Sequence, residues 1–291
     1  MKEFISGNIK LINETLAIIL NGSYEINGKT VKLKLKKDQI TESTVYSNEK
    51  VNRLINYPVY QNPISSERCQ FSVENKDSFE VALDVIDSDL FKSDKNANNV
   101  LVLNFASPIY PGGGVLFGEK GQEEDLCRRS TLLISLLGKG ARSMYEYNRN
   151  NMSFTASDYM AVSPNVEIIR GENMELLDDT KIVSVLTATA PIAIEGLQNI
   201  EEEELEKLIF NRILGMLRIA VSKKYEYLVL GAWGCGAFAN DADVISRLFK
   251  KAFEYVDSSL EGNGSFFKKV VFAVLDNTED QYNYKCFKNN F

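Results

Sequence analysis

The sequence predicts an α/β fold in which short buried strands are followed by glycine-rich loops and then by helices. Asn99 to Leu103 contains an apolar run that is too short for a helix and reads as a buried strand. Prolines and glycines interrupt the chain directly after it, and helical spacing begins at Leu126. The same order recurs in strand Tyr227 to Leu230, the glycine-rich segment Gly231 to Asn240, and a helical pattern from Asp241 to Val256. Two such units are typical of an open sheet that binds ligands at the carboxyl ends of its strands.

The first part of the chain is predicted to begin with a helix and a β-hairpin. Apolar residues recur at helical spacing from Lys10 to Leu20, and Asn21-Gly22 is typical of a helix end. Asn27-Gly28 favours the tight turn of a hairpin between Tyr24 to Ile26 and Thr30 to Leu35. The lysines that alternate along the second strand are interpreted as a solvated face that protects the sheet edge, rather than as a patch for polymer or nucleic acid.

A proline-containing connector, Tyr57 to Ser66, separates this hairpin from a strand candidate at Phe71 to Val73. Ser78 to Leu90 has helical spacing, with Ser78 at the N-cap position. The hydrophilic segment Lys92 to Asn99 then predicts a domain boundary. We therefore expect an accessory α+β extension at residues 1–95, packed on a main domain at residues 96–291.

The main domain continues with alternating strands and helices. Two short strands, Tyr159 to Val162 and Val166 to Arg170, are predicted on either side of Ser163-Pro164-Asn165, and Lys181 to Ala188 is a buried strand. Glu201 to Lys224 is predicted as a long amphipathic helix, because glutamates at its start and lysines at its end suit the helix dipole. The last elements are a strand at Lys269 to Leu275 and a helix at Asp280 to Phe287.

Composition narrows the class of protein. The chain of 291 residues is 44% hydrophobic and 25% charged, which is ordinary for a soluble globular protein. The N-terminal segment is interrupted by Glu3 and Lys10 and fits neither a signal peptide nor an anchor, so we expect a cytoplasmic protein without a membrane partner. A net charge of −7 argues against general nucleic-acid binding. The sequence makes no prediction of oligomeric state.

The residue types that are present limit the chemistry. There is no histidine, which excludes Ser-His-Asp and Cys-His catalysis and histidine metal sites and leaves carboxylates as the leading acid–base groups. Four cysteines stand far apart without a CxxC pair, which argues against a disulfide scaffold and a cysteine zinc site. The cysteines are Cys69, Cys127, Cys235 and Cys286, and we expect most of them to be small buried apolar residues.

The segment from Pro108 to Asp125 combines features of an anion site with carboxylates. Gly112 to Gly114 allow positive φ and remove every Cβ, so backbone N–H groups can converge on an anion, usually a phosphate. For a glycine run alone, a flexible surface turn is the alternative. Glu123, Glu124 and Asp125 suit a helix N-terminus. Glu124 and Asp125 each stand four residues before an arginine, Arg128 and Arg129, and could form favourable pairs with them. Since a negative charge beside a diphosphate is costly, we expect one acid to act in chemistry or to hold ribose hydroxyls.

Gly112-Gly113-Gly114, seven intervening residues and Gln122-Glu123-Glu124 resemble the GGG…QEE signature of microbial-type poly(ADP-ribose) glycohydrolases, which are related to macrodomains. The resemblance extends to Ser163 to Val166, to Thr187 to Pro191, and to the second glycine segment with Trp233, Phe238 and Asn240. It implies a macrodomain-like three-layer α/β/α fold with a mixed central sheet for the catalytic domain, residues 96–291, plus the N-terminal extension.

The resemblance also implies roles for individual residues. Glu124 would be the catalytic acid, and Glu123 a partner that orders ribose hydroxyls. Asn104 would meet the distal ribose, Gly112 to Val115 would close over it, Phe238 would pack against it, and Gly234 to Phe238 would bind the diphosphate. No metal and no redox cofactor is needed. The residues implied to contact ADP-ribose are Asn104, Gly112, Gly113, Gly114, Val115, Gln122, Gly234, Cys235, Gly236, Ala237, Phe238 and Asn240.

The implied chemistry suits two adjacent glutamates. Neighbouring residues on a helix diverge by about 100°, so Glu123 and Glu124 cannot play the same part. Cleavage of a ribose–ribose bond needs a protonated carboxyl on the leaving oxygen and then a carboxylate that activates water. We therefore expect release of ADP-ribose from poly(ADP-ribose) on modified macromolecules, from the polymer end. Two alternatives stay open: a hydrolase for single ADP-ribose groups on protein or nucleic acid, and an ADP-ribose-binding module without activity, against which the presence of both glutamates argues.

Overall fold

The computed structural model describes residues 2–57, 68–95, 99–194, 200–258, 260 and 264–291. Within them, seven strands form one mixed sheet in the order β3-β6-β7-β5-β8-β9-β4. The strands from β7 to β4 run parallel to one another, while β6 is antiparallel to both β7 and β3. In sheet order the bounds are Thr44–Tyr46, Met160–Arg170, Leu176–Ala188, Leu101–Phe105, Tyr227–Leu230, Lys269–Ala273 and Gln70–Glu74.

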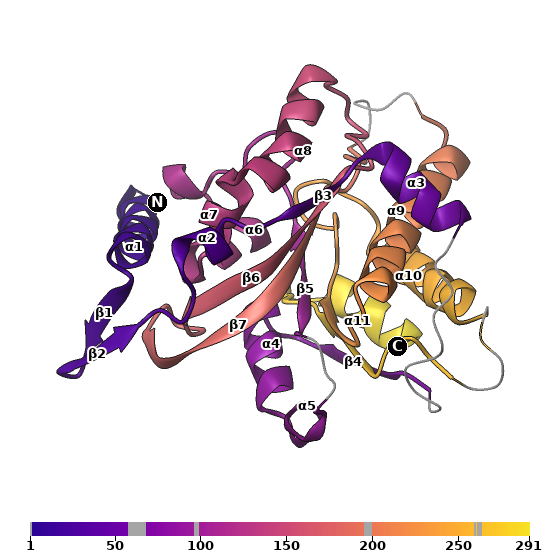
Figure 1. Ribbon diagram of the computed structural model, residues 1–291. Coiled ribbons are helices and arrows are strands. Elements are labelled where there is room, and N and C mark those ends of the chain that lie inside the picture. The colour runs from indigo at the N-terminus through magenta and orange to yellow at the C-terminus, as the bar shows by residue number, and fades with distance from the viewer. Residues whose placement is uncertain (1, 58–67, 96–98, 195–199, 259, 261–263) are drawn as a thin grey trace.

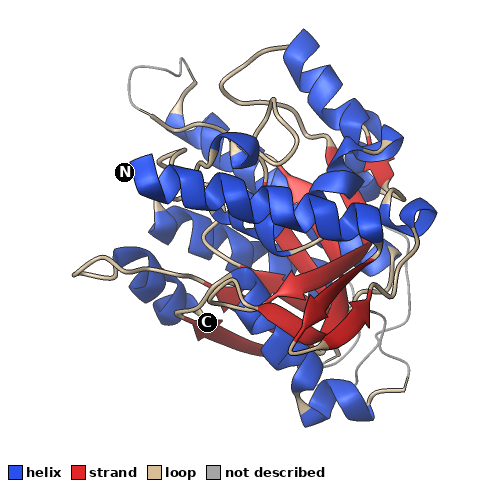
Figure 2. Cartoon of the chain, turned by 90° about the vertical axis from the view of Figure 1, so that its left-hand side faces the viewer, coloured by secondary structure: helices blue, strands red, loops and turns tan. Residues whose placement is uncertain are grey.

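Helices cover both faces of this sheet, so the molecule has three layers, α/β/α. One face is covered by α3 (Asn48–Asn56), α9 (Glu202–Ser222), α10 (Ala242–Asp257) and α11 (Tyr282–Asn290), and Figure 1 shows α9 to α11 to the right of the sheet. The other face is covered by α1 (Lys2–Asn21), α4 (Ser78–Asp87), α6 (Gln122–Arg129), α7 (Leu132–Leu137) and α8 (Lys139–Asn150). Figure 2 shows α1, marked by the N-terminus, lying across that face. The macrodomain-like architecture is confirmed.

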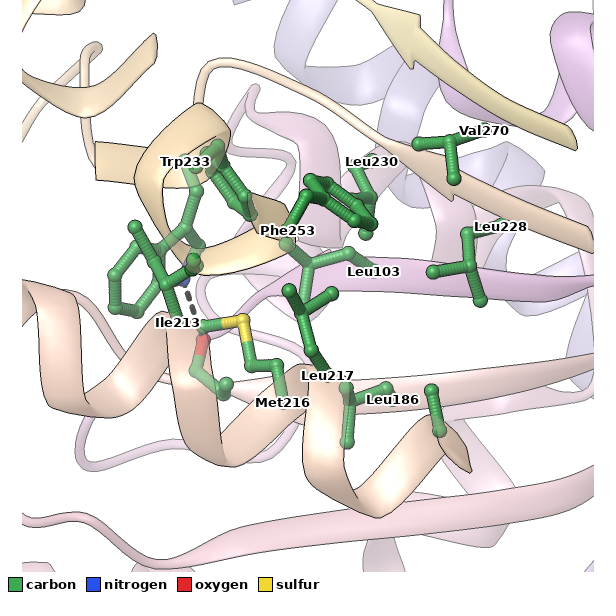
Figure 3. Packing of buried hydrophobic residues seen from close by; sticks show 14 of the residues in the cluster. Leu103, Leu186, Ile213, Met216, Leu217, Leu228, Leu230, Trp233, Phe253 and Val270 are labelled. Atoms are coloured by element: carbon green, nitrogen blue, oxygen red, sulfur yellow. Dashed lines mark hydrogen bonds between the residues drawn. The ribbon is translucent and has the colours of Figure 1, made fainter. Parts of the chain in front are cut away.

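The central strands are apolar on both sides because each side faces a helix layer. In β5, Leu101 and Leu103 belong to the core under α9 and α10, whereas Val102 belongs to the core under α4 and α6. Figure 3 shows the first of these cores, where Ile213, Met216 and Leu217 of α9 pack against Leu103 and its neighbours. Continuous apolar runs of this kind are what a parallel strand buried on both faces requires.

The N-terminal part of the chain is built into the sheet rather than attached to it. The two edge strands, β3 and β4, both precede residue 95, and β4 pairs in parallel with β9, some 200 residues later in the chain. The predicted boundary near residue 95 therefore cuts through the sheet and does not separate two cores. The β1–β2 hairpin (Ser23–Ile26 and Lys29–Lys32) forms a separate two-stranded sheet, with positive φ at Asn27 and Gly28 as predicted.

Several predicted elements have different bounds in the structure. The helix predicted from Ser78 to Leu90 is two helices, α4 and α5 (Asp89–Ser93), because Ser88 caps the second one. Its N-cap is Asp77 rather than Ser78, since the Asp77 carboxylate accepts the amides of Phe79 and Glu80. The two short strands around Ser163-Pro164-Asn165 are one strand, β6, with a bulge between Ser163 and Val166. The first helix begins eight residues before the predicted Lys10, and Leu20 is 80% exposed rather than on its buried face.

Other predictions concern features outside the sheet. The proline-containing connector at 57–66 lies almost wholly outside the described residues. All four cysteines are free; Cys127 and Cys286 are buried, whereas Cys69 and Cys235 are partly exposed. In the part of the chain that the structure describes, no helix is both long and apolar enough to cross a bilayer. The remaining short helices are α2 (Lys37–Ile40) and the 3-10 turn η1 (Val115–Phe117), which were not predicted.

Candidate active site

A cavity of about 670 Å³ lies at the carboxyl ends of the parallel strands. Its walls come from the segments that directly follow β5, β8 and β9, because these strands are adjacent and end at the same edge of the sheet. The helices that follow β5 and β8 lie on opposite faces, so the cavity stands where the connections diverge. Such a position is the usual ligand site of an open α/β sheet. We call residues 106–121 the first loop and residues 231–241 the second loop.

Glu123 lines the cavity but is almost wholly buried, and it is held by four hydrogen bonds. Its side chain is 2% exposed, and its carboxylate accepts the amides of Ser107 (2.7 Å) and Gly112 (3.2 Å). It also accepts Asn104 Nδ2 (3.2 Å) and the hydroxyl of Tyr145 (3.0 Å). These donors come from β5, the first loop and α8, so three elements fix the position of one carboxylate. Burial raises the pKa of Glu123 to about 7, although the hydrogen bonds and the charge of Glu124 act on it as well.

Glu124 is the neighbouring residue on α6, but its setting is different. It lines the cavity and is partly exposed, and its Oε1 accepts the amide of Gly114 (2.9 Å). Both carboxylates nevertheless meet at Gly113: a Cβ at that position would overlap Oε1 of Glu124 and would lie 3.3 Å from Oε2 of Glu123. The two glutamates therefore converge on one glycine, one from a buried position and one from the cavity.

The first loop uses its glycines to fit around these carboxylates. Gly112 and Gly113 have φ values of 76° and 57°, which favour glycine. The amides of its three successive glycines are occupied: Gly112 and Gly114 donate to the glutamates, and Gly113 donates to the carbonyl of Tyr110 (2.9 Å). The loop is an anion-binding loop, as predicted, but the anions are the protein's own carboxylates. Gly112, Gly113, Gly114 and Val115 do not line the cavity.

Asn104 and Gln122 support the site from below. Asn104 is fully buried and donates to Glu123 and to Thr187 Oγ1 (3.3 Å), so its amide orients the glutamate and does not line the cavity. Gln122 lines the cavity, but its side chain already bonds the carbonyl of Leu103 (2.7 Å) and the amide of Phe105 (2.9 Å). Both residues join β5 to the start of α6.

The second loop is open where the first is occupied. Gly234, Gly236, Ala237 and Phe238 line the cavity, and among the described residues no protein acceptor receives the amides of Gly236, Ala237 or Phe238. A Cβ at Gly236 would meet no atom within 4 Å. Backbone N–H groups without partners at the wall of a cavity are suited to a phosphate.

Buried side chains hold this loop in place. Asn240 is 5% exposed and donates to the carbonyls of Gly234 (3.0 Å) and Pro191 (2.8 Å). The Trp233 indole donates to the carbonyl of Ala188 (3.0 Å), as Figure 3 shows. Asn240 and Cys235 do not line the cavity, so the structure places these two predicted binding residues behind the loop rather than in contact with the space.

The predicted acid pairs are formed only in part. Asp125 accepts from Arg129 Nη1 at 3.1 Å, and Asp77 also binds this arginine at 2.7 Å. Arg128, in contrast, donates to the carbonyl of Glu119 (2.7 Å). Burial raises the pKa of Asp125. The Arg129 side chain is 1% exposed, so this cluster fastens α6 to the start of α4.

Two groups at the site were not predicted. Tyr145 of α8, which is 22 residues later in the sequence than Glu123, donates a hydrogen bond to it. Asn8 of α1 lines the cavity and donates to the carbonyl of Gly118 (2.9 Å). Nothing in the local sequence marks either residue, because both contacts depend on how distant helices pack. Within the described residues, no group of three cysteines or acids is arranged to hold a metal ion.

The comparisons with known proteins agree with this geometry. A family model described as the microbial-type PARG catalytic domain matches residues 12–171. The structure of poly(ADP-ribose) glycohydrolase (PARG) from Thermomonospora curvata is 28% identical, with coverage of 98% of this chain and 100% of that chain and a TM-score of 0.84. The same enzyme bound to the inhibitor ADP-HPD has a TM-score of 0.82.

A second bacterial enzyme is similar over most of the chain. The glycohydrolase from Deinococcus radiodurans in complex with ADP-ribose is 30% identical, with coverage of 89% of this chain and 98% of that chain and a TM-score of 0.75. No curated protein matches. The family model covers more than half of the 291 residues, and it includes the first loop and both glutamates. The chain therefore belongs to the family of microbial-type poly(ADP-ribose) glycohydrolases.

Proposed function

We propose that this chain hydrolyses poly(ADP-ribose) by binding the terminal ADP-ribose unit in the cavity and cleaving the ribose–ribose bond beside Glu124. The observation that carries this proposal is the pair of adjacent glutamates that meet at Gly113 in two different environments. Glycosidic cleavage needs one carboxyl that exchanges a proton with the leaving oxygen and with water. Both glutamates line the cavity, but Glu123 is 2% exposed and already held by four donors, whereas Glu124 is partly exposed.

The two loops give the bound unit a direction. The diphosphate fits the second loop, because the amides of Gly236, Ala237 and Phe238 face the cavity without protein acceptors among the described residues. The distal ribose then lies between Phe238 and the glutamates, since these groups share the same cavity. In this orientation, the anomeric carbon of the distal ribose faces Glu124, and the hydroxyls of that ribose reach toward Glu123.

The reaction follows from this placement. Protonated Glu124 gives its proton to the leaving oxygen as the bond between the anomeric carbon and that oxygen breaks, and positive charge develops on the distal ribose. The resulting Glu124 carboxylate then takes a proton from water as the water oxygen bonds to the anomeric carbon. The products are free ADP-ribose and a polymer that is one unit shorter, and Glu124 ends protonated as it began.

Glu123 acts as a fixed acceptor rather than as the proton donor. Four donors hold its carboxylate, so it is rigid at the point where ribose hydroxyls would arrive. A pKa of about 7 means that its charge is present mainly above neutral pH in the empty site. A charged Glu123 beside the distal ribose stabilises the positive transition state, because opposite charges attract strongly in a dry site.

We infer that the terminal unit is the one that is cleaved. Helix α1 packs on η1 and α6, and Asn8 of α1 lines the cavity while its amide holds Gly118 at the end of η1. This helix closes one side of the cavity, so a polymer that continued past the bound unit in that direction would meet protein. The expected early products are single ADP-ribose units rather than oligomers.

The decisive experiment compares wild-type protein with Glu124→Gln on poly(ADP-ribosyl)ated and mono(ADP-ribosyl)ated protein. The wild type is expected to release ADP-ribose from the polymer and to leave the last unit on the protein. Glu124→Gln is expected to lose activity by about 10²–10⁴-fold while it still binds ADP-ribose. Glu119→Gln, an exposed acid on the same loop, is the matched control and should keep wild-type activity.

Each other outcome decides between the alternatives. If ADP-ribose were released only from the mono-modified protein, the substrate would be a single ADP-ribose group rather than the polymer. Binding of ADP-ribose without release from either substrate would identify a binding module. Full activity of Glu124→Gln would remove this residue from the mechanism, and oligomers among the first products would contradict action from the end.

A further inference from the structure

An exposed tyrosine of the first loop and an exposed arginine of α8 meet the same stretch of backbone, and neither lines the cavity. Tyr110 is 65% exposed, and the exposed Arg149 of α8 donates through Nη1 to the carbonyl of Ile109, the preceding residue (2.7 Å). Neither Tyr110 nor Arg149 lines the cavity. The function proposed above, which concerns the unit inside the cavity, does not use them.

The loop fixes Tyr110 close to Glu124. The amide of Tyr110 donates to Ser107 Oγ (3.2 Å), and its carbonyl accepts the amide of Gly113 (2.9 Å). Gly113 is the residue at which the two glutamates meet, and the amide of the next residue, Gly114, binds Glu124. The backbone of Tyr110 is therefore one hydrogen bond away from the glycine that touches the catalytic carboxylate.

Arg149 holds its guanidinium against the backbone of Ile109, the residue before Tyr110. One of its nitrogens is used on the Ile109 carbonyl, and within the described chain no carboxylate forms an ion pair with its guanidinium. Arg142, two turns earlier on the same helix, behaves differently, because it pairs with Glu146 at 2.8 Å. A guanidinium that is oriented by a backbone carbonyl and keeps its other donors can bind a phosphate.

The chemistry of the polymer places matching groups near Glu124. The leaving oxygen is the 2′ oxygen of an adenosine ribose in the next ADP-ribose unit. Adenine is attached to C1′, the neighbouring carbon of that ribose, and the diphosphate is attached at C5′. A flat base and two negative phosphates of the leaving unit are therefore both within one ribose of the oxygen that Glu124 protonates.

We propose that Tyr110 and Arg149 form a subsite for the leaving ADP-ribose unit, in which the tyrosine ring stacks on its adenine and the guanidinium pairs with its diphosphate. This inference rests on the proposed function, because it assigns the far side of the bond that Glu124 cleaves. Aromatic rings bind bases by stacking without needing to read their edges, and an arginine adds the charge that phosphates require. The subsite distinguishes a polymer from substrates that lack a second unit.

The test compares two substrates in the full-length protein. One is poly(ADP-ribose), and the other is ADP-ribose with a substituted phenol on the anomeric carbon, which keeps the terminal unit but replaces the leaving unit. Tyr110→Ala and Arg149→Ala are each expected to lower kcat/KM on the polymer by about tenfold, mainly through KM. The aryl substrate should be cleaved at the wild-type rate. Tyr110→Trp should keep polymer activity, since it preserves the stacking surface.

Arg142→Ala provides the matched control, because it removes an exposed arginine from the same helix without touching the loop. It should leave both substrates unaffected. Equal losses on the two substrates for Tyr110→Ala and Tyr110→Trp would show that the loop had been distorted and would overturn the subsite. Wild-type kinetics of Tyr110→Ala and Arg149→Ala on the polymer would overturn it as well. Failure of the proposed function would look different, since the wild type itself would then not cleave the polymer.

Discussion

The two glycine loops look alike in sequence but differ in what their amides bind. Both follow a central parallel strand, and both border the same cavity region. In the first loop, Gly112 and Gly114 donate to Glu123 and Glu124, so the loop already holds two carboxylates. In the second loop, the amides of Gly236 and its two successors have no protein acceptor among the described residues. The first loop fits around the proposed catalytic groups, and the second leaves room for a ligand.

A glycine run therefore indicates a loop that can bind an anion. It does not show whether that anion is a ligand or a carboxylate of the same chain. In the first loop the glycines are required by close contact with carboxylates of the same chain. In the second loop Gly236 has open space around it, which a ligand can fill. Substitutions in the two loops should therefore fail in different ways.

The largest effect is expected for Gly113→Ala. The new methyl group would overlap Oε1 of Glu124, and alanine would be strained at a φ of 57°. We expect a loss of poly(ADP-ribose) hydrolysis of at least about 10²-fold, because the general acid would be displaced. Activity and thermal unfolding measured together would check this, and an active, normally stable Gly113→Ala would contradict the close contact.

Gly236→Ala is the matched substitution in the second loop. Its methyl group would meet no protein atom within 4 Å, so the free energy of unfolding should change by less than about 0.5 kcal/mol. Its binding of ADP-ribose should nevertheless weaken, because the methyl group enters the space that we propose for the diphosphate. Calorimetric titration with ADP-ribose separates the two effects. Unchanged affinity would move the diphosphate away from this loop.

The next prediction concerns how the free energy of unfolding depends on pH, and it tests the contribution of Glu123 alone. Its pKa is raised from 4.5 to about 7 in the folded state, so the folded protein binds more protons than the unfolded chain between these values. This contribution is fully present below pH 4.5 and is lost as the pH rises through 7. It amounts to about 3 kcal/mol. Urea unfolding of the wild type and Glu123→Gln across this range should show a decline that only the wild type has.

Glu119→Gln serves as the control for that experiment, because it changes an exposed glutamate of the first loop. It should keep the wild-type dependence on pH. If Glu123→Gln declined as steeply as the wild type, another group would be responsible for the slope.

A smaller effect is expected for Asn240→Ala, which tests the support of the second loop. The substitution removes the hydrogen bonds to the carbonyls of Gly234 and Pro191, each worth about 1 kcal/mol. We expect ADP-ribose to bind about tenfold more weakly, because the amides of the loop would no longer be held in place. Asn56→Ala, an exposed amide on α3, should not change binding. Equal affinity for Asn240→Ala and the wild type would show that the loop holds its shape without this side chain.

The smallest effect is expected for Tyr145→Phe, which removes one of the four donors from Glu123. A donor to a carboxylate lowers its pKa, so its loss should raise the pKa of Glu123 above 7 and extend the decline in stability to higher pH. The loss near pH 8 should be about 1 kcal/mol relative to the wild type. Tyr255→Phe, on the exposed side of α10, should leave the profile unchanged.

Local patterns predicted the central strands and the long helices well. Strand β8 has the predicted bounds, and α9 differs from its prediction by one or two residues. Both carry a strong periodic or continuous apolar pattern, and each is stabilised by the layers that this pattern fits. Strand β3 was not predicted, and β4 was predicted only as an isolated strand, because a short edge strand depends on partners far away in the chain. Its pairing with β9 cannot be read from either segment alone.

In the candidate site, too, local patterns predicted some features, whereas others depend on contacts with distant parts of the chain. The sequence identified both loops and both glutamates, yet it placed Asn104 and Asn240 in contact with ligand. In the structure their amide groups bind Glu123 and the second loop instead. The direction of a side chain at the end of a strand or loop depends on the surrounding backbone, which composition and spacing do not define. In this structure Asn104 holds Glu123 and Asn240 holds the second loop, and contact of either residue with a ligand stays a prediction.

By itself, the sequence determined the class of fold, the two loops and the type of chemistry, because these follow from apolar runs, glycine spacing and the available acid–base groups. Only the tertiary structure decided which glutamate is buried. Glu123 and Glu124 are identical neighbours on one helix, and the difference between them comes from Asn104, Ser107 and Tyr145, which folding brings to one carboxylate and not to the other. Burial and hydrogen bonding are properties of the assembled surroundings, so they set the role of each acid only once the chain has folded.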